Sequence, residues 1–173
     1  LRKELTEIDP ELVEGMIRAE GASTSYTVVL SPPDLDRIFF HHPGANDRFA
    51  PAEIDPDHLA EADLLHFGYP PIMKETYADG GEGLAELFRA VGERSVPVAL
   101  DMAQPDPDSP AGRVDWTDWL ATVLPETDLF APSFEEILFM LDRERHDALR
   151  DHAGKGSLLQ AAGVQELGRL SER

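Results

Sequence analysis

The chain has 173 residues, of which 42% are hydrophobic and 28% charged, as expected for a globular protein with a hydrophobic core. Thirty-four acidic and fifteen basic side chains give a formal net charge of −19, which argues against binding to nucleic acid or to an anionic membrane surface. The sequence contains no cysteine, which excludes disulfides and zinc–thiolate sites, and no stretch approaches the ~18 apolar residues that cross a bilayer.

The chain opens on Leu1 and a charged segment without the apolar stretch of a signal peptide, so we expect a cytoplasmic protein and a fragment of a longer chain.

The first predicted element is a helix that begins at Asp9-Pro10, an N-cap residue followed by proline at the first helical position. Apolar residues then recur on one helix face at Leu12, Val13, Met16 and Ile17. The helix is expected to end near Gly21.

Two predicted strands follow. Residues 25–30 (Ser-Tyr-Thr-Val-Val-Leu) and 37–42 (Arg-Ile-Phe-Phe-His-His) are rich in strand-forming side chains, and the turn-prone Ser-Pro-Pro-Asp begins the segment between them. The connection is too short to hold a helix, so the two strands are expected to form an antiparallel hairpin.

From residue 63 onward, short apolar runs alternate with helical patterns. The predicted strands are 63–67, 96–100 and 128–131, and the predicted helices are 83–91, 116–123 and 133–141. This alternation is typical of an α/β fold in which helices cover a parallel sheet. Residues 142–173 are charged and are expected to be helical with a loop. We treat residues 1–173 as a single partial domain.

Segment 41–46, His-His-Pro-Gly-Ala-Asn, ends the predicted hairpin. Gly44 permits a positive φ or a close approach of two backbones, and Asn46 offers both a donor and an acceptor to a polyol. By itself the segment is also typical of a Pro-Gly turn capped by asparagine, which is the structural interpretation.

The carboxyl ends of parallel strands form the edge at which α/β proteins bind ligands. Asp101 ends a predicted strand, and the proline-rich segment 104–114 follows it at this edge. His66 lies within an apolar strand, and we expect it to be a hydrogen-bonded core residue. The histidines do not have the spacing of metal ligands on one helix, so a zinc hydrolase is not favoured.

Ser133 and Glu136 stand at the junction between a predicted strand and a predicted helix. Their spacing indicates a capping box, and the alternative is a carboxylate that holds Mg²⁺ through water.

Segments 154–157 and 81–83 are glycine-containing, but neither completes a phosphate-binding motif. Trp116 and Trp119 are expected to form a packing face rather than a base-stacking platform.

Several segments resemble, in order along the chain, the middle of the ribokinase-like (PfkB family) carbohydrate kinases. They are residues 25–30, Arg37, residues 42–46, residues 62–69 (Ala-Asp-Leu-Leu-His-Phe-Gly-Tyr), residues 98–101 (Val-Ala-Leu-Asp) and residues 128–136. The order, rather than any single motif, carries the resemblance, which extends over about residues 10–142.

The resemblance implies a Rossmann-like domain with a small β-lid, formed here by residues 25–46, that closes over a sugar or nucleoside-like substrate. The positions that would contact the substrate are Gly44, Asn46, Gly68, Tyr69 and Asp101. Ser133 and Glu136 would lie near the nucleotide and its phosphates, with Glu136 helping to place Mg²⁺ through water. ATP is the implied phosphoryl donor.

Two features depart from the family pattern. Ser133 replaces the asparagine of the family's Asn-x-x-Glu motif, and Asp101 is followed by Met-Ala-Gln, where the family often has Pro-Asn and then arginine. The family's Gly-Ala-Gly-Asp, which supplies the catalytic base, is absent. We therefore expect the base to lie beyond Arg173 and assign no catalytic residue within this chain.

The leading hypothesis is ATP-dependent phosphorylation of a sugar or sugar-like alcohol, with the 173 residues inactive when isolated. The alternative is a non-catalytic binding or assembly piece of the same fold, and an α/β hydrolase is least favoured because no Gly-x-Ser-x-Gly segment occurs. The apolar run 38–40 fits either a homodimer formed through the lid or packing against the domain's own pocket.

Overall fold

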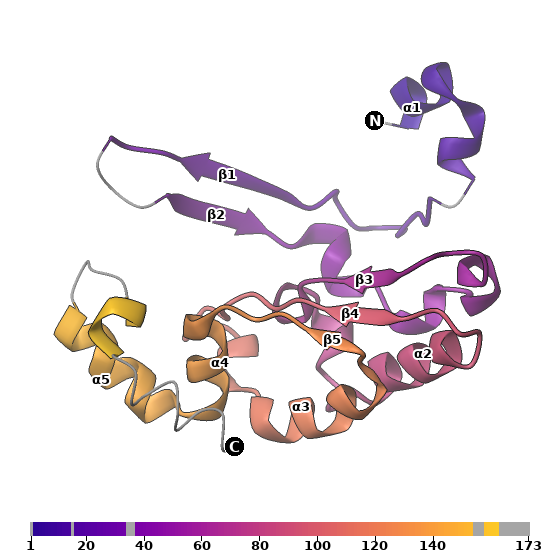
Figure 1. Cartoon of the computed structure of the whole chain (residues 1–173). Coiled ribbons are helices and arrows are strands. Elements are labelled where there is room, and N and C mark those ends of the chain that lie inside the picture. The colour runs from indigo at the N-terminus through magenta and orange to yellow at the C-terminus, as the bar shows by residue number, and fades with distance from the viewer. Residues whose placement is uncertain (1, 15, 34–36, 154–157, 163–173) are drawn as a thin grey trace. The chain divides into compact units, whose positions relative to one another are not determined.

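The computed structural model describes residues 2–14, 16–33, 37–153 and 158–162 (Figure 1). The chain forms two compact units, Leu1–Ala45 and Asn46–Arg173, which we describe one at a time. Within the described residues, no helix has the length and apolar character needed to span a membrane.

The N-terminal segment differs from the predicted helix of residues 10–20. An α-helix, α1, covers Arg2–Ile8, and only a 3-10 helix, Pro10–Val13, follows it. Asp9 is the N-cap as predicted, because its carboxylate accepts from the amide of Glu11 at 3.0 Å. The helix does not continue toward Gly21, and Ile17 is 50% exposed. Without a surface to bury its apolar face, so short a helix is marginal in water.

The predicted hairpin is confirmed. Strand β1 (Tyr26–Leu30) pairs antiparallel with β2 (Ile38–His42), in a register that sets Tyr26 opposite His42 and Leu30 opposite Ile38. A hydrogen bond of 2.8 Å also joins Thr27 Oγ1 to His41 Nδ1 across the strands. Every residue of both strands is exposed in the described structure.

Gly44 closes the base of the hairpin and shows both properties expected of it. Its φ is +52°, and a Cβ at this position would lie 2.5 Å from the carbonyl oxygen of Ser23. The neighbouring amide of Ala45 donates to the same carbonyl at 2.8 Å. Only glycine allows the two backbones to come this close.

The second unit contains a parallel three-stranded sheet with strand order β3-β4-β5. Its strands are β3 (Leu65–Phe67), β4 (Val98–Leu100) and β5 (Leu129–Phe130). Helix α2 (Glu82–Gly92) connects β3 to β4, and α3 (Trp116–Val123) lies between β4 and β5 in the chain. The α/β fold, with a parallel sheet and a separate antiparallel hairpin, is therefore confirmed.

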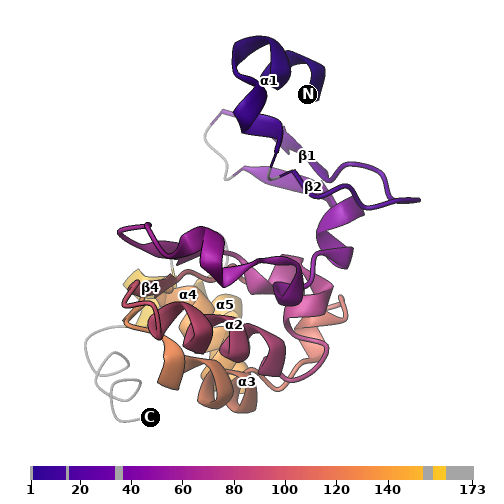
Figure 2. The same ribbon diagram turned by 90° about the vertical axis from the view of Figure 1, so that its right-hand side faces the viewer.

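Helices α2 and α3 lie side by side and cover one face of this sheet (Figures 1 and 2). The buried residues of α2 recur at helical spacing: Leu84, Ala85, Leu87, Phe88 and Val91. Trp116 and Trp119 of α3 are 2% and 1% exposed, and their ring centroids lie 5.2 Å apart. The prediction that the two tryptophans form a packing face is confirmed.

Two more helices complete the described part of the unit, α4 (Phe134–Leu141) and α5 (Arg143–Ala153). Leu138 of α4 and Leu149 of α5 pack together with Leu158 in a second, smaller apolar cluster. The helical prediction for the region after residue 142 is confirmed by α5. Residues 154–157, which carry the Gly-Lys-Gly-Ser segment, and residues 163–173 lie outside the described residues.

Candidate functional site

The carboxyl ends of the three parallel strands meet at one edge of the sheet. Hydrogen bonds continue the ladder just beyond the strands, since the amide of Asp101 donates to Phe67 O at 2.9 Å and the amide of Ala131 donates to Leu100 O at 3.0 Å. The residues that follow β3, β4 and β5 are thus neighbours, although they come from segments far apart in the sequence. Ligand sites of α/β proteins occupy this position.

Gly68 and Asp101, two of the predicted substrate positions, lie next to each other at this edge. A Cβ placed on Gly68 would be 3.6 Å from Asp101 Cβ. Asp101 is partly buried, and its Oδ1 accepts from the amide of Met102 at 2.8 Å, which fixes the orientation of the carboxylate. Tyr69 follows Gly68 with 44% of its surface exposed. The edge therefore combines an oriented carboxylate, a position without a side chain and an exposed aromatic ring.

His66 is exposed, and the prediction that it is a core residue is wrong. Successive strand residues point to opposite faces, and Phe67 is buried in the core with Phe88 of α2. His66 therefore points to the other face, where its Cε1 would lie 4.0 Å from a Cβ on Gly68. The alternation of the strand was the signal that could have placed this imidazole beside Gly68.

Ser133 and Glu136 form the predicted capping box at the start of α4. The amide of Glu136 donates to Ser133 Oγ at 3.3 Å, and the amide of Ser133 donates to Glu136 Oε2 at 2.7 Å. The capping interpretation is confirmed, and it leaves Oε1 of Glu136 without a hydrogen-bond partner among the described residues. A carboxylate with one oxygen engaged in a cap can still contact a hydrated cation through the other oxygen.

The part of the chain that the structure describes holds no group of three His, Cys, Asp or Glu side chains arranged for a metal ion. Mg²⁺ commonly keeps several waters and is bound by one or two carboxylates together with substrate phosphates. The described side chains at this edge do not by themselves form a dedicated protein cage for a metal ion.

Gly44 and Asn46 lie on either side of the division between the two units. Gly44 belongs to the hairpin unit. Asn46 opens the second unit and is partly buried, and its main-chain carbonyl accepts from the amide of Phe49 at 3.2 Å.

The neighbouring Asp47 affects the pKa of Tyr77. Burial raises this pKa, and the negative charge of Asp47 raises it further.

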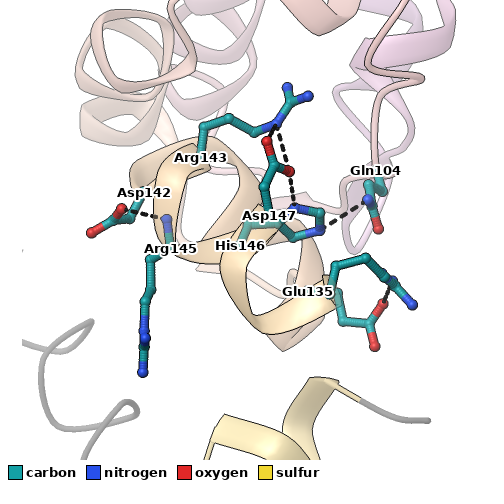
Figure 3. A network of polar contacts seen from close by, with 8 residues as sticks. Gln104, Glu135, Asp142, Arg143, Arg145, His146 and Asp147 are labelled. Carbon is teal, nitrogen blue, oxygen red and sulfur yellow. Dashed lines mark hydrogen bonds and ion pairs between the residues drawn. The ribbon is translucent and has the colours of Figure 1, made fainter. Parts of the chain in front are cut away.

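A polar cluster that the sequence did not reveal connects the segment after β4 to α5 (Figure 3). His146 is 3% exposed, and its Nε2 lies 3.2 Å from Gln104 Nε2. Its Nδ1 lies 2.9 Å from Asp147 Oδ1, and Arg143 donates to both oxygens of the same carboxylate at 3.0 Å. Burial alone would raise the pKa of Asp147, but hydrogen bonds from His146 and Arg143 and the charge of Arg143 lower it below its ordinary value.

Together, the fold and the edge define an α/β protein with an oriented carboxylate at the ligand-binding end of a parallel sheet. No protein-family model matches the chain, and no curated protein matches it in sequence. Among solved structures, the "Crystal Structure of Sa239" is similar over 91% of this chain and 48% of that one, with 16% sequence identity and a TM-score of 0.51. This likeness concerns the fold alone.

The "Structure of Ribokinase from Giardia lamblia" is similar over 92% of this chain and 45% of that one, with 17% sequence identity and a TM-score of 0.49. The chain spans about half the length of both structures.

Proposed function

We propose that this chain forms part of a kinase that transfers the γ-phosphoryl group of ATP to a hydroxyl of a sugar, nucleoside or similar alcohol. The observation that carries the proposal is the meeting of Gly68, Asp101 and segment 131–136 at one edge of a parallel sheet. These three places follow successive strands in the order in which similar motifs occur in the ribokinase-like family. The proposal assigns no catalytic base within residues 1–173.

Each residue of the edge has a definite task in this proposal. Asp101 accepts a hydrogen bond from a substrate hydroxyl through Oδ2, because Oδ1 is held by the amide of Met102. Gly68 leaves room for the substrate beside that carboxylate, and the exposed ring of Tyr69 packs on a sugar face. The family resemblance assigns Gly44 and Asn46 to substrate contact as well.

Glu136 and Ser133 belong to the nucleotide side of the proposed site. When bound, Mg²⁺ neutralises charge on the phosphates of ATP. Glu136 would hold Mg²⁺ through water by Oε1, while Oε2 caps α4. The start of α4 also offers backbone amides that the capping box does not use, a feature of helix N-termini that bind phosphate in many nucleotide sites.

Glu136→Gln in the full-length gene product is expected to lower sugar-dependent ADP release by about 10–100-fold, the usual effect of losing a group that acts on a metal through water. Glutamine can still serve in a capping box, so the stability of α4 is retained. The matched control is Glu86→Gln, an exposed position on α2 that is expected to leave the rate unchanged. The measurement is a coupled ADP assay across a panel of sugars and nucleosides, with thermal stabilisation recorded in parallel.

The outcomes of this experiment separate the candidate functions. Sugar-dependent ADP release that falls in Glu136→Gln but not in Glu86→Gln supports the kinase and the role of Glu136. Stabilisation by a sugar without turnover supports a non-catalytic binding piece of the same fold instead. A wild-type protein that shows neither effect contradicts both functions.

We further propose that the hairpin acts as a lid and pairs with the hairpin of a second copy. One of its faces carries five exposed apolar side chains: Tyr26, Val28, Leu30, Ile38 and Phe40. The opposite face carries Val29 and Phe39 together with the Thr27–His41 pair. An isolated two-stranded hairpin is marginal in water, so this surface is expected to be covered.

Phe40→Lys is expected to convert a dimer into a monomer, because it places a charge in the middle of the larger apolar face. Phe40 is 59% exposed in the described structure, so the change does not disturb a core. Light scattering at several concentrations provides the mass. Phe39→Lys on the opposite face is the control and is expected to remain dimeric. A wild-type protein that is monomeric at all concentrations would contradict pairing through the hairpin.

A further inference from the structure

We propose that His146 is a positioning residue that holds the segment leaving β4 against helix α5. This segment, residues 102–114, begins directly after Asp101 and therefore borders the candidate site. Gln104 is its contact with His146, 42 residues away in the sequence. The inference concerns the ordering of the segment, and its importance for substrate binding rests on the proposed function.

The contacts of the ring assign its tautomer. Asp147 is a carboxylate that only accepts, so the Nδ1 that lies 2.9 Å from it carries the proton and donates. In the neutral ring Nε2 is then an acceptor, and the amide of Gln104 donates to it across 3.2 Å. Arg143 donates to both oxygens of Asp147, and its charge keeps that carboxylate ionised. The hydrogen bond to Gln104 thus depends on the orientation of His146, which Asp147 and Arg143 hold in place.

Packing around the ring makes this orientation rigid. Phe139 of α4 meets the imidazole edge to face, with centroids 5.2 Å apart and planes at 80°. Arg143 lies over the same phenyl ring, 4.2 Å from its centroid. His146 is almost fully buried, so Nε2 without Gln104 would lack the water that satisfies exposed acceptors.

The segment is also tied to the core by its two ends and by the buried Pro105, which follows Gln104. Met102 is buried at its start, and Ala111 accepts from Trp116 Nε1 at 2.9 Å near its end. The backbone contacts within residues 106–114 are local, such as Ser109 N to Asp106 O at 3.0 Å and the amide of Gly112 to Ser109 Oγ at 3.1 Å. The Gln104–His146 hydrogen bond therefore joins the segment of residues 102–114 to helix α5.

Hydrogen exchange on the 173-residue protein tests the proposal without any ligand. Gln104→Met preserves the shape of the side chain and removes the donor, and His146→Leu removes the acceptor. Both are expected to speed exchange of the amides of residues 108–114 about fivefold or more, the factor that corresponds to one hydrogen bond of ordinary net strength. Amides of α2 serve as the internal reference and are expected to be unchanged.

A conservative variant separates positioning from simple core filling. His146→Gln ends in a group that can still accept from Gln104, so exchange is expected to return to within about twofold of the wild type. The double variant Gln104→Met/His146→Leu is expected to be no faster than either single variant, because both remove the same bond. If His146→Leu does not fold, Gln104→Met still tests the bond from the less buried side.

Three results would overturn the proposal. They are unchanged exchange in folded Gln104→Met, equal acceleration in His146→Gln and His146→Leu, and a ring nitrogen spectrum that shows the proton on Nε2 of His146. None of these measurements uses a sugar or ATP. A failure here therefore leaves the kinase proposal standing, and a failure of the kinase assay leaves this one standing.

Discussion

Replacing Trp119 by alanine is expected to destabilise the second unit by about 3–5 kcal/mol, the usual cost of removing a large aromatic side chain from a core. The residue is 1% exposed and packs edge to face on Trp116. Its Nε1 also donates to the carbonyl of Thr76 at 3.0 Å, so the change leaves a buried acceptor without its donor. Domains of this size have total stabilities of about 5–15 kcal/mol, so a large part of the margin is lost.

Urea unfolding followed by circular dichroism measures this loss, since fluorescence would change with the tryptophan itself. Leu129→Ala is the matched control, because Leu129 is an apolar residue of the same unit that is 57% exposed. Its effect is expected to stay within about 0.5 kcal/mol. A Trp119→Ala variant as stable as the control would contradict the packing of α3 against the segment around Thr76.

Gly81→Ala is expected to cost about 2–4 kcal/mol, from overpacking and from an unfavourable backbone conformation together. Gly81 is the N-cap of α2 and has a φ of +89°. A Cβ there would lie 2.8 Å from Trp119 Nε1 and 2.8 Å from Val123 Cγ2. Both atoms belong to the buried face of α3, so the helix itself would have to move.

Two other glycines at the ends of α2, Gly80 and Gly92, separate the two causes. Gly80 has a φ of +75° but nothing within 4 Å of a Cβ, so Gly80→Ala is expected to cost only the conformational part, about 1 kcal/mol. Gly92, at the end of α2, is equally open and its φ is not positive, so Gly92→Ala is expected to stabilise by about 0.4–1 kcal/mol. Thermal or urea unfolding of the three variants tests the order, and equal losses at Gly80 and Gly81 would exclude a clash with α3.

Elements whose signal is local were predicted correctly. The strands and helices from residue 63 onward follow apolar patterns of period 2 or 3.6, and α3 matches the predicted 116–123 (Trp116–Val123). The capping box at Ser133 involves residues three positions apart, so spacing alone was enough. The requirement for glycine at position 44 was also visible in the Pro-Gly turn.

The errors fall where burial depends on distant parts of the chain. The spacing of apolar residues predicted a helix toward Gly21, but Ile17 finds no surface to cover it and the helix stops early. His66 was assigned to the core because its neighbours in sequence are apolar. In the folded chain its side chain is exposed on the face opposite to the buried Phe67.

The sequence alone therefore determines the α/β order of elements, the hairpin and the residues that follow each strand, because these depend on local periodicity and on caps. Which of those residues meet is decided by the tertiary structure. Parallel pairing brings Gly68 beside Asp101, and helix packing sets Gln104 against His146 and Gly81 against Trp119. Such contacts join residues more than thirty positions apart, where no pattern in the sequence records the geometry that the folded chain imposes.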